Sequence, residues 1–590
     1  MCNIYSILNN FYDKEIIRQN FYKGSSRGPE FSCCGHINDN VFMAFHRLAI
    51  NGTGENFEKS NQPFSINNVH LICNGEIYNW KELYNIIGKD KQTTNSDCEV
   101  IIHLYKLFGI HETLQMLDGV FGFVLYDENT QEVYVARDLF GIRPLYTCFH
   151  TNNVGEKAIS FASQAKQFDY MPKKSDNYIV EQHAPGCYSK FILSRHGRFV
   201  SNMMNVKFTG IKVDIDPKLY NVSLATKMIR EKLTAAVKKR IDNTDRPICC
   251  LLSGGLDSSL IASIVKNYYK GDLHTWSIGL EGSEDLEKAQ KVADFLGTKH
   301  HSITVTEKEF LSLIPQVIYQ IESYDTTTVR ASVGNYAISS YIRTNSDSKV
   351  IFNGDGSDEL AGGYMYFHAA PSDYAFDREC KRLLKDIHFY DVLRSDRSIS
   401  NNGLEARTPF LDKDFVRSYL SIPSSLRNHN NNNDLEDNND HKNIEKWLLR
   451  KSFDCVIEEG NNAGSKYLPD EVLWRKKEAF SDGVSKATKS WFEIIQDYVT
   501  ENIYGEDLVN SSTAFEKKIA TNVLLSKKTF NINKNTPMTL EQLYYREVFN
   551  EYFPYGSNMI PYFWMPKFIN ATDASARTLD IYKKFQNKKI

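Results

Sequence analysis

One short glycine-rich segment constrains the fold of this chain more than any other. It reads Ser253-Gly254-Gly255-Leu256-Asp257-Ser258-Ser259 and follows a continuous apolar run at residues 248–252, which predicts a strand buried on both faces. The glycines permit a tight turn, and the backbone N–H groups at the start of the following helix can surround an anion. Asp257 would repel a bare phosphate, so we expect a bridging Mg²⁺. The GxxxxGK[ST] pattern of a P-loop is absent, which disfavours cleavage of a γ-phosphate.

The rest of the chain divides into two regions with different patterns. After about residue 210, apolar runs alternate with helical patterns, which predicts an α/β domain with a parallel sheet flanked by helices. Before it, short apolar runs between turn residues, with a helix at 98–108, predict an α+β domain. We place the two domains at residues 2–208 and 209–590. Residues 427–443 have almost no apolar content and predict a disordered surface insertion.

Charge and composition narrow the class of protein. The 590 residues carry 70 Lys plus Arg against 73 Asp plus Glu, a net charge of -3, so no basic field favours nucleic acid as a partner. No apolar run approaches the ~18 residues of a membrane span, and none marks a secretion signal at the start. The 11 cysteines form no CxxC pair. These features favour a cytoplasmic enzyme of small molecules.

A second polar loop follows another buried run at residues 350–352. It reads Asn353-Gly354-Asp355-Gly356-Ser357-Asp358-Glu359. Since the carboxyl ends of neighbouring parallel strands share one edge of a sheet, we expect both loops to meet there. The first loop resembles the pyrophosphate-binding loop of ATP pyrophosphatases, which cleave ATP between the α- and β-phosphates. The resemblance implies that ATP is a co-substrate, that Asp257 and Asp358 bind Mg²⁺, and that ATP or diphosphate is bound by Leu251, Ser253, Gly254, Gly255, Asp257, Ser258, Ile278, Asn353 and Gly354.

The chain starts Met1-Cys2, and removal of Met1 would leave Cys2 with a free α-amine of pKa about 7.7 to 8. That amine could take the thiol proton, so one residue would supply nucleophile and base. Several downstream motifs are similar to those of class II glutamine amidotransferases, which implies an αββα sandwich of the N-terminal nucleophile type. The motifs are Arg27-Gly28-Pro29, His46-Arg47-Leu48-Ala49-Ile50, Asn74-Gly75-Glu76-Ile77-Tyr78-Asn79, Ser96-Asp97-Cys98-Glu99 and Asp118-Gly119.

This second resemblance assigns roles around Cys2. The side chain of Asn74 and the N–H of Gly75 would stabilise an oxyanion. Arg47 would bind the carboxylate of glutamine, and Glu76 and Asp97 its ammonium group. The remaining glutamine-binding positions are Leu48, Ala49, Ile50 and Asn51. Three positions depart from the usual pattern: Asn3 replaces Gly, Ser26 replaces His and Glu30 replaces Asp.

An amide-hydrolysing domain followed by an adenylating domain resembles the glutamine-hydrolysing asparagine synthetases almost end to end. The likeness includes residues 324–332, 403–407, 475–483 and 573–578. It implies conversion of L-aspartate, L-glutamine, ATP and water to L-asparagine, L-glutamate, AMP and diphosphate. The intermediate would be β-aspartyl-AMP, with ammonia passed between the domains. Lys477 matches the catalytic lysine, Arg330 is a weaker second cation, and Asp355 stands where relatives carry Glu. Whether the chain forms a homodimer is left open by the sequence.

Two other readings of the motifs remain. One is a β-lactam-forming or other amide-forming synthetase, which shares both domains but uses another carboxylate or closes a ring. The other is a catalytically silent regulatory protein descended from such an enzyme. The intact set around Cys2 weighs against the first. Asn3 and Ser26 would favour the second, and intact Asn74, Asp97, Lys477 and the glycine-rich loop weigh against it.

Overall fold

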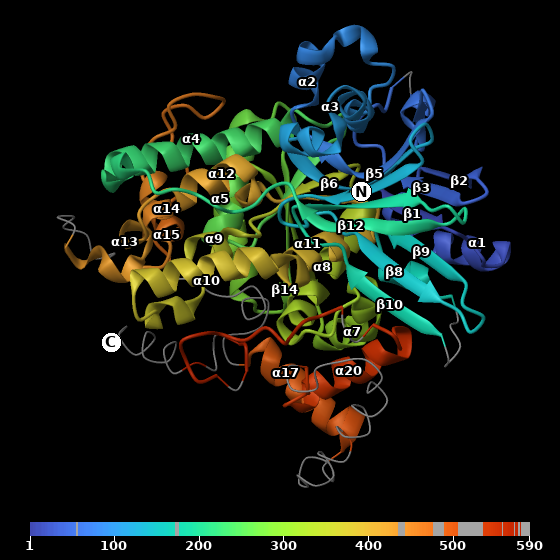
Figure 1. Ribbon diagram of the computed structural model, residues 1–590. Coiled ribbons are helices and arrows are strands. Elements are labelled where there is room, and N and C mark those ends of the chain that lie inside the picture. The colour runs from blue at the N-terminus through green and yellow to red at the C-terminus, as the bar shows by residue number, and fades with distance from the viewer. Residues whose placement is uncertain are drawn as a thin grey trace.

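The structure is a computed structural model. It describes residues 1–54, 57–170, 176–434, 443–475, 489–505, 518, 535–556, 559–571, 573–575 and 579. Figure 1 shows the strands of the N-terminal half on one side and the long helices of the C-terminal half on the other. Within the described residues, no helix is long and apolar enough to cross a membrane.

The N-terminal half contains two antiparallel sheets of six strands each. One has the order β10-β8-β9-β1-β3-β2 and the other β12-β11-β7-β6-β5-β4. The strands of the first sheet are β1 (Asn3–Leu8), β2 (Phe31–Asn38), β3 (Val41–Arg47), β8 (Tyr146–Thr151), β9 (Lys157–Ala162) and β10 (Asn177–Gln182). Those of the second are β4 (Phe64–Ile66), β5 (Val69–Ile77), β6 (Gly119–Asp127), β7 (Glu132–Arg137), β11 (Cys187–Leu193) and β12 (Phe199–Lys207).

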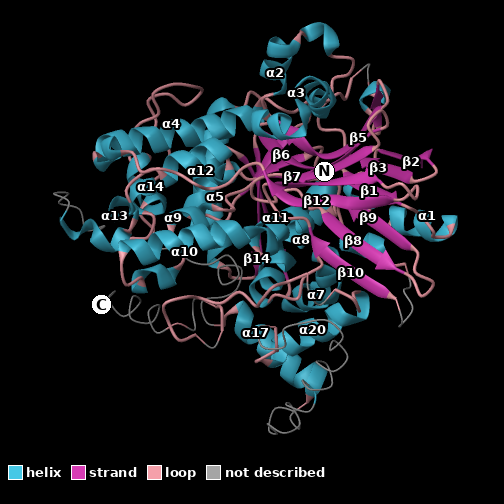
Figure 2. Cartoon of the chain, in the orientation of Figure 1, coloured by secondary structure: helices cyan, strands magenta, loops and turns pink. Residues whose placement is uncertain are grey.

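The two sheets pack face to face, with helices on their outer faces. Side chains such as Met43 and Val124 form the core between the sheets, since strand residues alternate between the two faces. Helix α1 (Lys14–Tyr22) covers the first sheet, and α2 (Trp80–Ile87) and α3 (Val100–Met116) cover the second. The predicted αββα sandwich is confirmed (Figure 2).

The C-terminal half contains one parallel sheet of five strands in the order β15-β14-β13-β16-β17. Its strands are β13 (Ile248–Leu251), β14 (His274–Leu280), β15 (Lys299–Val305), β16 (Val350–Phe352) and β17 (Glu405–Arg407). Helices pack on both faces, as predicted for an α/β domain. They include α4 (Val222–Ile241), α5 (Leu256–Tyr268), α6 (Glu284–Leu296), α7 (Glu307–Ile321), α8 (Thr326–Asn345), α9 (Ser357–Ala361), α10 (Asp373–Asp386), α11 (Asp391–Ser400), α12 (Lys413–Leu420), α13 (Ser424–Arg427), α14 (Trp447–Ser452) and α15 (Asp470–Leu473).

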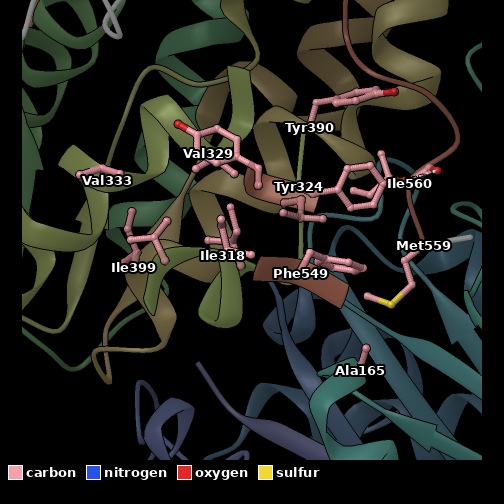
Figure 3. Packing of buried hydrophobic residues seen from close by; sticks show 14 of the residues in the cluster. Ala165, Ile318, Tyr324, Val329, Val333, Tyr390, Ile399, Phe549, Met559 and Ile560 are labelled. Atoms are coloured by element: carbon pink, nitrogen blue, oxygen red, sulfur yellow. Dashed lines mark hydrogen bonds between the residues drawn. The ribbon is translucent and has the colours of Figure 1, made fainter. Parts of the chain in front are cut away.

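One hydrophobic cluster spans both halves of the molecule. Ala165 comes from the N-terminal half and Ile399 from α11, and both belong to a cluster that includes Phe549 of the last described helix (Figure 3). That helix, α20 (Leu540–Tyr552), lies beside α17 (Trp491–Tyr498) at the lower edge of Figure 1. The two halves are therefore joined by a continuous apolar core.

The segment expected to be a disordered insertion is ordered where it begins. Arg427, Asn428 and His429 are buried, and a 3₁₀ helix covers His429–Asp434. Arg427 donates to the carbonyl of Ile422 and pairs with Asp377 of α10. These first residues belong to the fold, in contrast to the solvated loop expected from residue 427, whereas residues 435–442 lie outside the described part of the chain.

Candidate functional site

Cys2 lies at the start of β1, beside the loop that follows β3. Its Sγ is 3.7 Å from the carbonyl oxygen of Leu48, and its side chain is half-buried. Burial raises the pKa of the Cys2 thiol, so attack requires a proton acceptor close to the sulfur. Met1 is buried, and its amine lies 3.4 Å from the carbonyl oxygen of Leu404. The predicted nucleophile thus lies where the two domains meet.

The Asn74 side chain is buried on β5 with its polar atoms unused. It is 1% exposed, and neither Nδ2 nor Oδ1 has a hydrogen-bond partner among the residues that the structure describes. A buried amide without partners costs free energy that a ligand would recover. The next residue, Gly75, packs so closely on β6 that a Cβ would lie 2.7 Å from the carbonyl oxygen of Val120. This geometry suits an oxyanion hole, in which the donor is fixed before the substrate arrives.

The buried carboxylates of Glu76 and Asp97 share one hydrogen-bond donor. The side-chain amide of Asn243 is 2.8 Å from Glu76 Oε2 and 3.5 Å from Asp97 Oδ2. Burial raises the pKa of both carboxyls, and the charge of Glu405 raises that of Glu76 further. Arg407, which pairs with Glu76 at 3.3 Å, opposes this rise, and the ammonium group of an amino acid would relieve the remaining cost.

The guanidinium of Arg47 is held by the loop that follows β3. It donates to the carbonyl oxygens of Phe57, Asn51 and Gly52 at 2.6, 2.9 and 3.1 Å and to Asn61 Oδ1 at 2.8 Å. The ring of Phe57 lies under it at 4.5 Å. Arg47 therefore shapes the loop that carries Asn51, and its contact with a substrate carboxylate stays a prediction.

The residues between Arg47 and Asn51 are held in place by contacts from both halves of the chain. Leu48, Ala49 and Ile50 are buried. The N–H of Ala49 donates to Glu30 at 2.5 Å, and the carbonyl of Ala49 accepts from Arg246 at 2.7 Å. Because Arg246 belongs to the C-terminal half and also pairs with Glu30 at 2.5 Å, the two halves together fix this loop.

Asn3, which stands where the resemblance expects glycine, has room in the core. Its side chain is buried and exchanges two hydrogen bonds with Gln167, at 2.9 and 3.0 Å. Gly24 lies against it, since a Cβ there would come within 2.5 Å of the Asn3 amide. Gln167 and Gly24 thus accommodate the asparagine at position 3.

A cavity of about 200 Å³ opens at the carboxyl ends of β13, β14 and β16. Nearly all predicted nucleotide and metal residues line it: Leu251, Ser253, Gly255, Asp257, Ser258, Ile278, Asn353, Gly354, Asp355 and Asp358. Gly254 lies within the same loop at a φ of 72°, a conformation that glycine adopts without strain. The expectation that both loops meet at one edge of the sheet is confirmed.

The two loops pack directly on one another. A Cβ on Gly354 would lie 2.7 Å from Cβ of Asp257 and 2.8 Å from the nitrogen of Ser258. Ser357 donates to Asp257 Oδ1 at 2.8 Å. The first loop leads into α5, whose N-cap Gly255 provides no side-chain cap. The backbone N–H groups of the first turn of α5 therefore have no side-chain cap at Gly255, and Leu256, Asp257 and Ser258 of that turn line the cavity, which suits an anion.

Lys446 also lines the cavity, although the sequence alone did not identify it as a candidate. Its Nζ lies 2.7 and 2.6 Å from the two oxygens of Asp257 and 2.5 Å from Asp358 Oδ1, and its side chain is 1% exposed. A lysine in front of the apolar run of α14 carries no distinctive spacing, so only the contact with the two loops reveals it. Arg450 and Arg475 add positive charge to the same cavity.

The carboxylates of Asp257 and Asp358 fit a Mg²⁺ site of the kind completed by phosphates. Both approach one point, now taken by the Lys446 ammonium, and Mg²⁺ in nucleotide sites commonly uses one or two carboxylates plus phosphate oxygens. Among the described residues, no group of three or more His, Cys, Asp and Glu side chains could hold a metal ion. A metal here would therefore depend on the nucleotide for its remaining ligands.

Asp355, which stands where relatives carry Glu, points one oxygen at a cation and leaves the other unused. Its Oδ1 accepts from Arg394 at 2.9 Å, and Oδ2 is buried with no partner in the described part of the chain. Burial raises the pKa of the carboxyl, although Arg394 opposes this. The free oxygen is placed to accept a proton or a hydrogen bond in the cavity.

The resemblance implies two further cations at this site. Arg330 does not line the cavity: it pairs with Glu541 at 2.6 Å and with Asp573 at 2.8 Å, and all three side chains are buried. Arg330 thus belongs to a buried ion triad that engages both edges of its guanidinium, and its contact with substrate stays a prediction. Lys477 lies outside the described residues.

Comparison with known proteins covers almost the whole chain. The family model for asparagine synthase matches residues 228–375 and 369–544, and that for a glutamine amidotransferase domain matches residues 1–196. The "Asparagine synthetase [glutamine-hydrolyzing]" of Gallus gallus is 38% identical over 99% of both chains. The proteins of the same name from Mus musculus and Homo sapiens show the same identity and coverage. The chain belongs to the family of glutamine-hydrolysing asparagine synthetases.

Proposed function

We propose that the chain converts L-aspartate, L-glutamine, ATP and water to L-asparagine, L-glutamate, AMP and diphosphate. One observation carries the proposal. A buried asparagine amide without partners lies on β5, which contacts β1, the strand that follows Cys2, and the same chain holds a cavity where two glycine-rich loops meet Lys446. Amide hydrolysis and carboxylate adenylation are the two reactions that these sites suit. We place the boundary between the two domains at residues 208–209, between β12 and α4.

In the glutaminase half, the Cys2 thiolate attacks the side-chain carbonyl of glutamine. Its own α-amine, freed by removal of Met1, takes the thiol proton and returns it to the departing ammonia. The negative oxygen of the tetrahedral intermediate accepts from Asn74 Nδ2. Glu76 and Asp97 hold the α-ammonium group, and Arg47 the carboxylate. Water then releases glutamate from the thioester.

In the synthetase half, the β-carboxylate of aspartate attacks the α-phosphorus of ATP. The bond to the β-phosphate breaks and diphosphate leaves. Lys446 and the N–H groups at the start of α5 stabilise the charge that develops on the leaving group. Mg²⁺ held by Asp257 and Asp358 would neutralise phosphate charge when bound. We propose that Lys446 acts beside Lys477, for which the resemblance implies the catalytic role.

The last step joins the two halves. Ammonia attacks the carbonyl of β-aspartyl-AMP, AMP leaves, and one proton must be removed from the nitrogen. Asp355, whose Oδ2 has no partner among the described residues, is placed to take it. Ammonia is protonated in bulk water, so we propose a protected path between Cys2 and the cavity. Glu405 and Arg407 of β17 pair with Arg143 and Glu76 of the N-terminal half, so buried residues of both halves meet at this boundary.

The function is tested by product stoichiometry in the wild-type chain and in Cys2→Ala. Wild type should form asparagine, glutamate, AMP and diphosphate in equal amounts, with ATP cleaved only when aspartate is present. Cys2→Ala should lose glutamine-dependent synthesis and keep synthesis from added ammonium. If both activities vanished together, the assignment of two separate sites would be wrong.

The same assay separates the alternatives. A β-lactam-forming or other amide-forming synthetase would release AMP with another carboxylate and make no asparagine. A silent regulatory descendant would release neither AMP nor glutamate. The cytoplasmic location and the homodimer stay predictions, which fractionation and light scattering would test.

A further inference from the structure

Helix α11 reaches the synthetase cavity with its first half. Arg394 donates to Asp355 Oδ1 at 2.9 Å and to Asp391 Oδ1 at 2.8 Å, and both Asp391 and Arg394 line the cavity. On the next residue, Ser395 Oγ accepts from Asn353 Nδ2 at 2.7 Å. The start of α11 is thus bonded to the second loop of the synthetase site.

The second half of α11 reaches the glutaminase nucleophile. Asp396 accepts from Arg27 NH1 at 2.6 Å and from NH2 at 3.3 Å, and Ser400 Oγ accepts from NH1 at 2.6 Å. The Nε of the same arginine donates to the carbonyl oxygen of Cys2 at 3.1 Å. A single side chain, Arg27, therefore links the synthetase domain to the backbone of the nucleophile.

This link is geometrically well defined. Arg27 is 0% exposed and Asp396 is 2% exposed, so water does not compete for their bonds. Although burial alone would raise it, the Arg27 charge holds the pKa of Asp396 below its ordinary value, so the carboxylate is ionised. A two-pronged arginine–carboxylate pair fixes both distance and orientation. The carboxylate therefore determines where the guanidinium, and with it the Cys2 carbonyl, can lie.

Arg394 and Asp396 are two residues apart on one helical turn. That spacing separates them by about 3 Å along the axis and places them on opposite sides of the helix. Since the residues from Val392 to Ser400 are all buried, the helix has no space in which one half could move alone. A displacement of Arg394 by substrate would be shared by Asp396.

We propose that Asp396 of the synthetase domain is a positioning residue for Cys2, acting through Arg27. We further infer that α11 carries the occupancy of the synthetase cavity to the glutaminase site. A substrate that bonds to Asp355 or Arg394 changes the interactions that hold the first half of α11, which is the differential contact that such coupling requires. This inference rests on the proposed function, because it assumes that Cys2 hydrolyses glutamine.

The test uses Asp396→Asn in the full chain. The shape of the side chain is kept, and the charge that fixes Arg27 is lost. We expect kcat for glutamine hydrolysis to fall on the order of 10- to 100-fold, as small misplacements of a nucleophile do. The KM for glutamine should stay near the wild-type value, because Arg47, Glu76 and Asp97 are untouched. Asp396→Glu, which keeps the charge, should recover part of kcat.

A matched control is Glu322→Gln. Glu322 is also buried, pairs with Arg397 on the same helix at 3.2 Å, and accepts from the N–H of Lys166 in the N-terminal half. Within the described residues it makes no hydrogen bond or ion pair with Arg27 or Cys2, so its loss should leave kcat within a factor of about two if the Arg27 link is what matters. If Glu322→Gln and Asp396→Asn lowered kcat equally, the effect would be loosened domain docking, and the proposal would be overturned.

Coupling is measured as the ratio of glutamine hydrolysis with and without aspartate and ATP. We expect a ratio different from one in wild type and close to one in Asp396→Asn. A ratio of one in wild type would refute the coupling, and an unchanged ratio in the variant would refute the role of Asp396. If the wild-type chain released no glutamate at all, the proposed function itself would be wrong. Failure of the proposed function is thus distinguishable from failure of the coupling alone.

Discussion

The ammonium group of Lys446 lies 2.6 Å from the carboxylate of Asp257, although 189 residues separate them in the chain. The same nitrogen is 2.5 Å from Asp358 in the second loop. When nucleotide enters, Mg²⁺ would bind the two carboxylates and phosphate would bind Lys446. Each charged group would then exchange one partner for another and would not become unpaired. Lys446 is thus the described cation best placed to stabilise departing diphosphate.

Replacement of this cation tests its role. Lys446→Met should lower aspartate-dependent release of diphosphate on the order of 10²- to 10³-fold, the cost of removing one preorganised donor from a developing charge. Glutamine hydrolysis without ATP should persist, because Cys2 and Asn74 are unaffected. The measurement is the exchange of labelled diphosphate into ATP, with glutaminase activity as the second readout.

Lys477→Met is the comparison for Lys446→Met, since the sequence motif assigns the catalytic role to Lys477. If both lysines stabilise the departing diphosphate, both variants should lose diphosphate exchange. A loss in Lys477→Met alone would mean that Lys446 only holds the two carboxylates in place.

The free polar atoms of Asn74 make a separate prediction. Asn74→Ala should lower glutamine hydrolysis on the order of 10²- to 10³-fold and keep ammonium-dependent synthesis. Its free energy of unfolding should not fall, because neither amide atom has a partner to lose among the described residues. Kinetics and urea unfolding of the same preparation check both parts.

Asn9 supplies the matched control for Asn74. It is also buried, but its side chain exchanges hydrogen bonds with Phe199 at 2.8 and 2.7 Å. Asn9→Ala should therefore cost about 1 to 3 kcal/mol of stability and leave glutamine turnover unchanged. A loss of stability in Asn74→Ala equal to that in Asn9→Ala would mean that Asn74 is structural.

Local chemistry made the glycine-rich loop predictable, and long-range contact made Lys446 unpredictable. The loop between β13 and α5 follows from a buried strand, turn residues and a helix start, all within a few residues. On α4, Leu233 is buried whereas Leu224, an identical apolar side chain, is 49% exposed. Segments that are distant in the sequence decide which apolar residues are buried. They also supply the partners of Lys446 and Arg330.

Stability should depend on pH through His46. Burial lowers its pKa to about 4, against an ordinary value of 6.5, while its ring stacks on Phe21 and bonds to Ser32. The folded state therefore disfavours protonation of His46. The stability that neutral His46 contributes is fully present above pH 6.5 and is lost as the pH falls toward 4. The loss from this group is about 2 kcal/mol at pH 5. Urea unfolding at pH 7 and pH 5 measures it.

His46→Gln provides the reference for this pH dependence. The amide can keep a hydrogen bond to Ser32 but does not titrate, so its stability should fall less between pH 7 and pH 5 than that of wild type. Equal slopes in the two proteins would show that other groups, such as His183 with its lowered pKa of about 3, dominate acid unfolding.

The ion triad of Arg330, Glu541 and Asp573 predicts a change in stability without a change in catalysis. Arg330→Met leaves two buried carboxylates without their cation, at a cost of about 3 to 5 kcal/mol. Adding Glu541→Gln and Asp573→Asn should return part of that stability, because the unpaired charges are gone. The KM values for aspartate and ATP should stay near wild type, since Arg330 does not line the cavity. A large rise in KM for aspartate with unchanged stability would instead establish Arg330 as a substrate-binding residue.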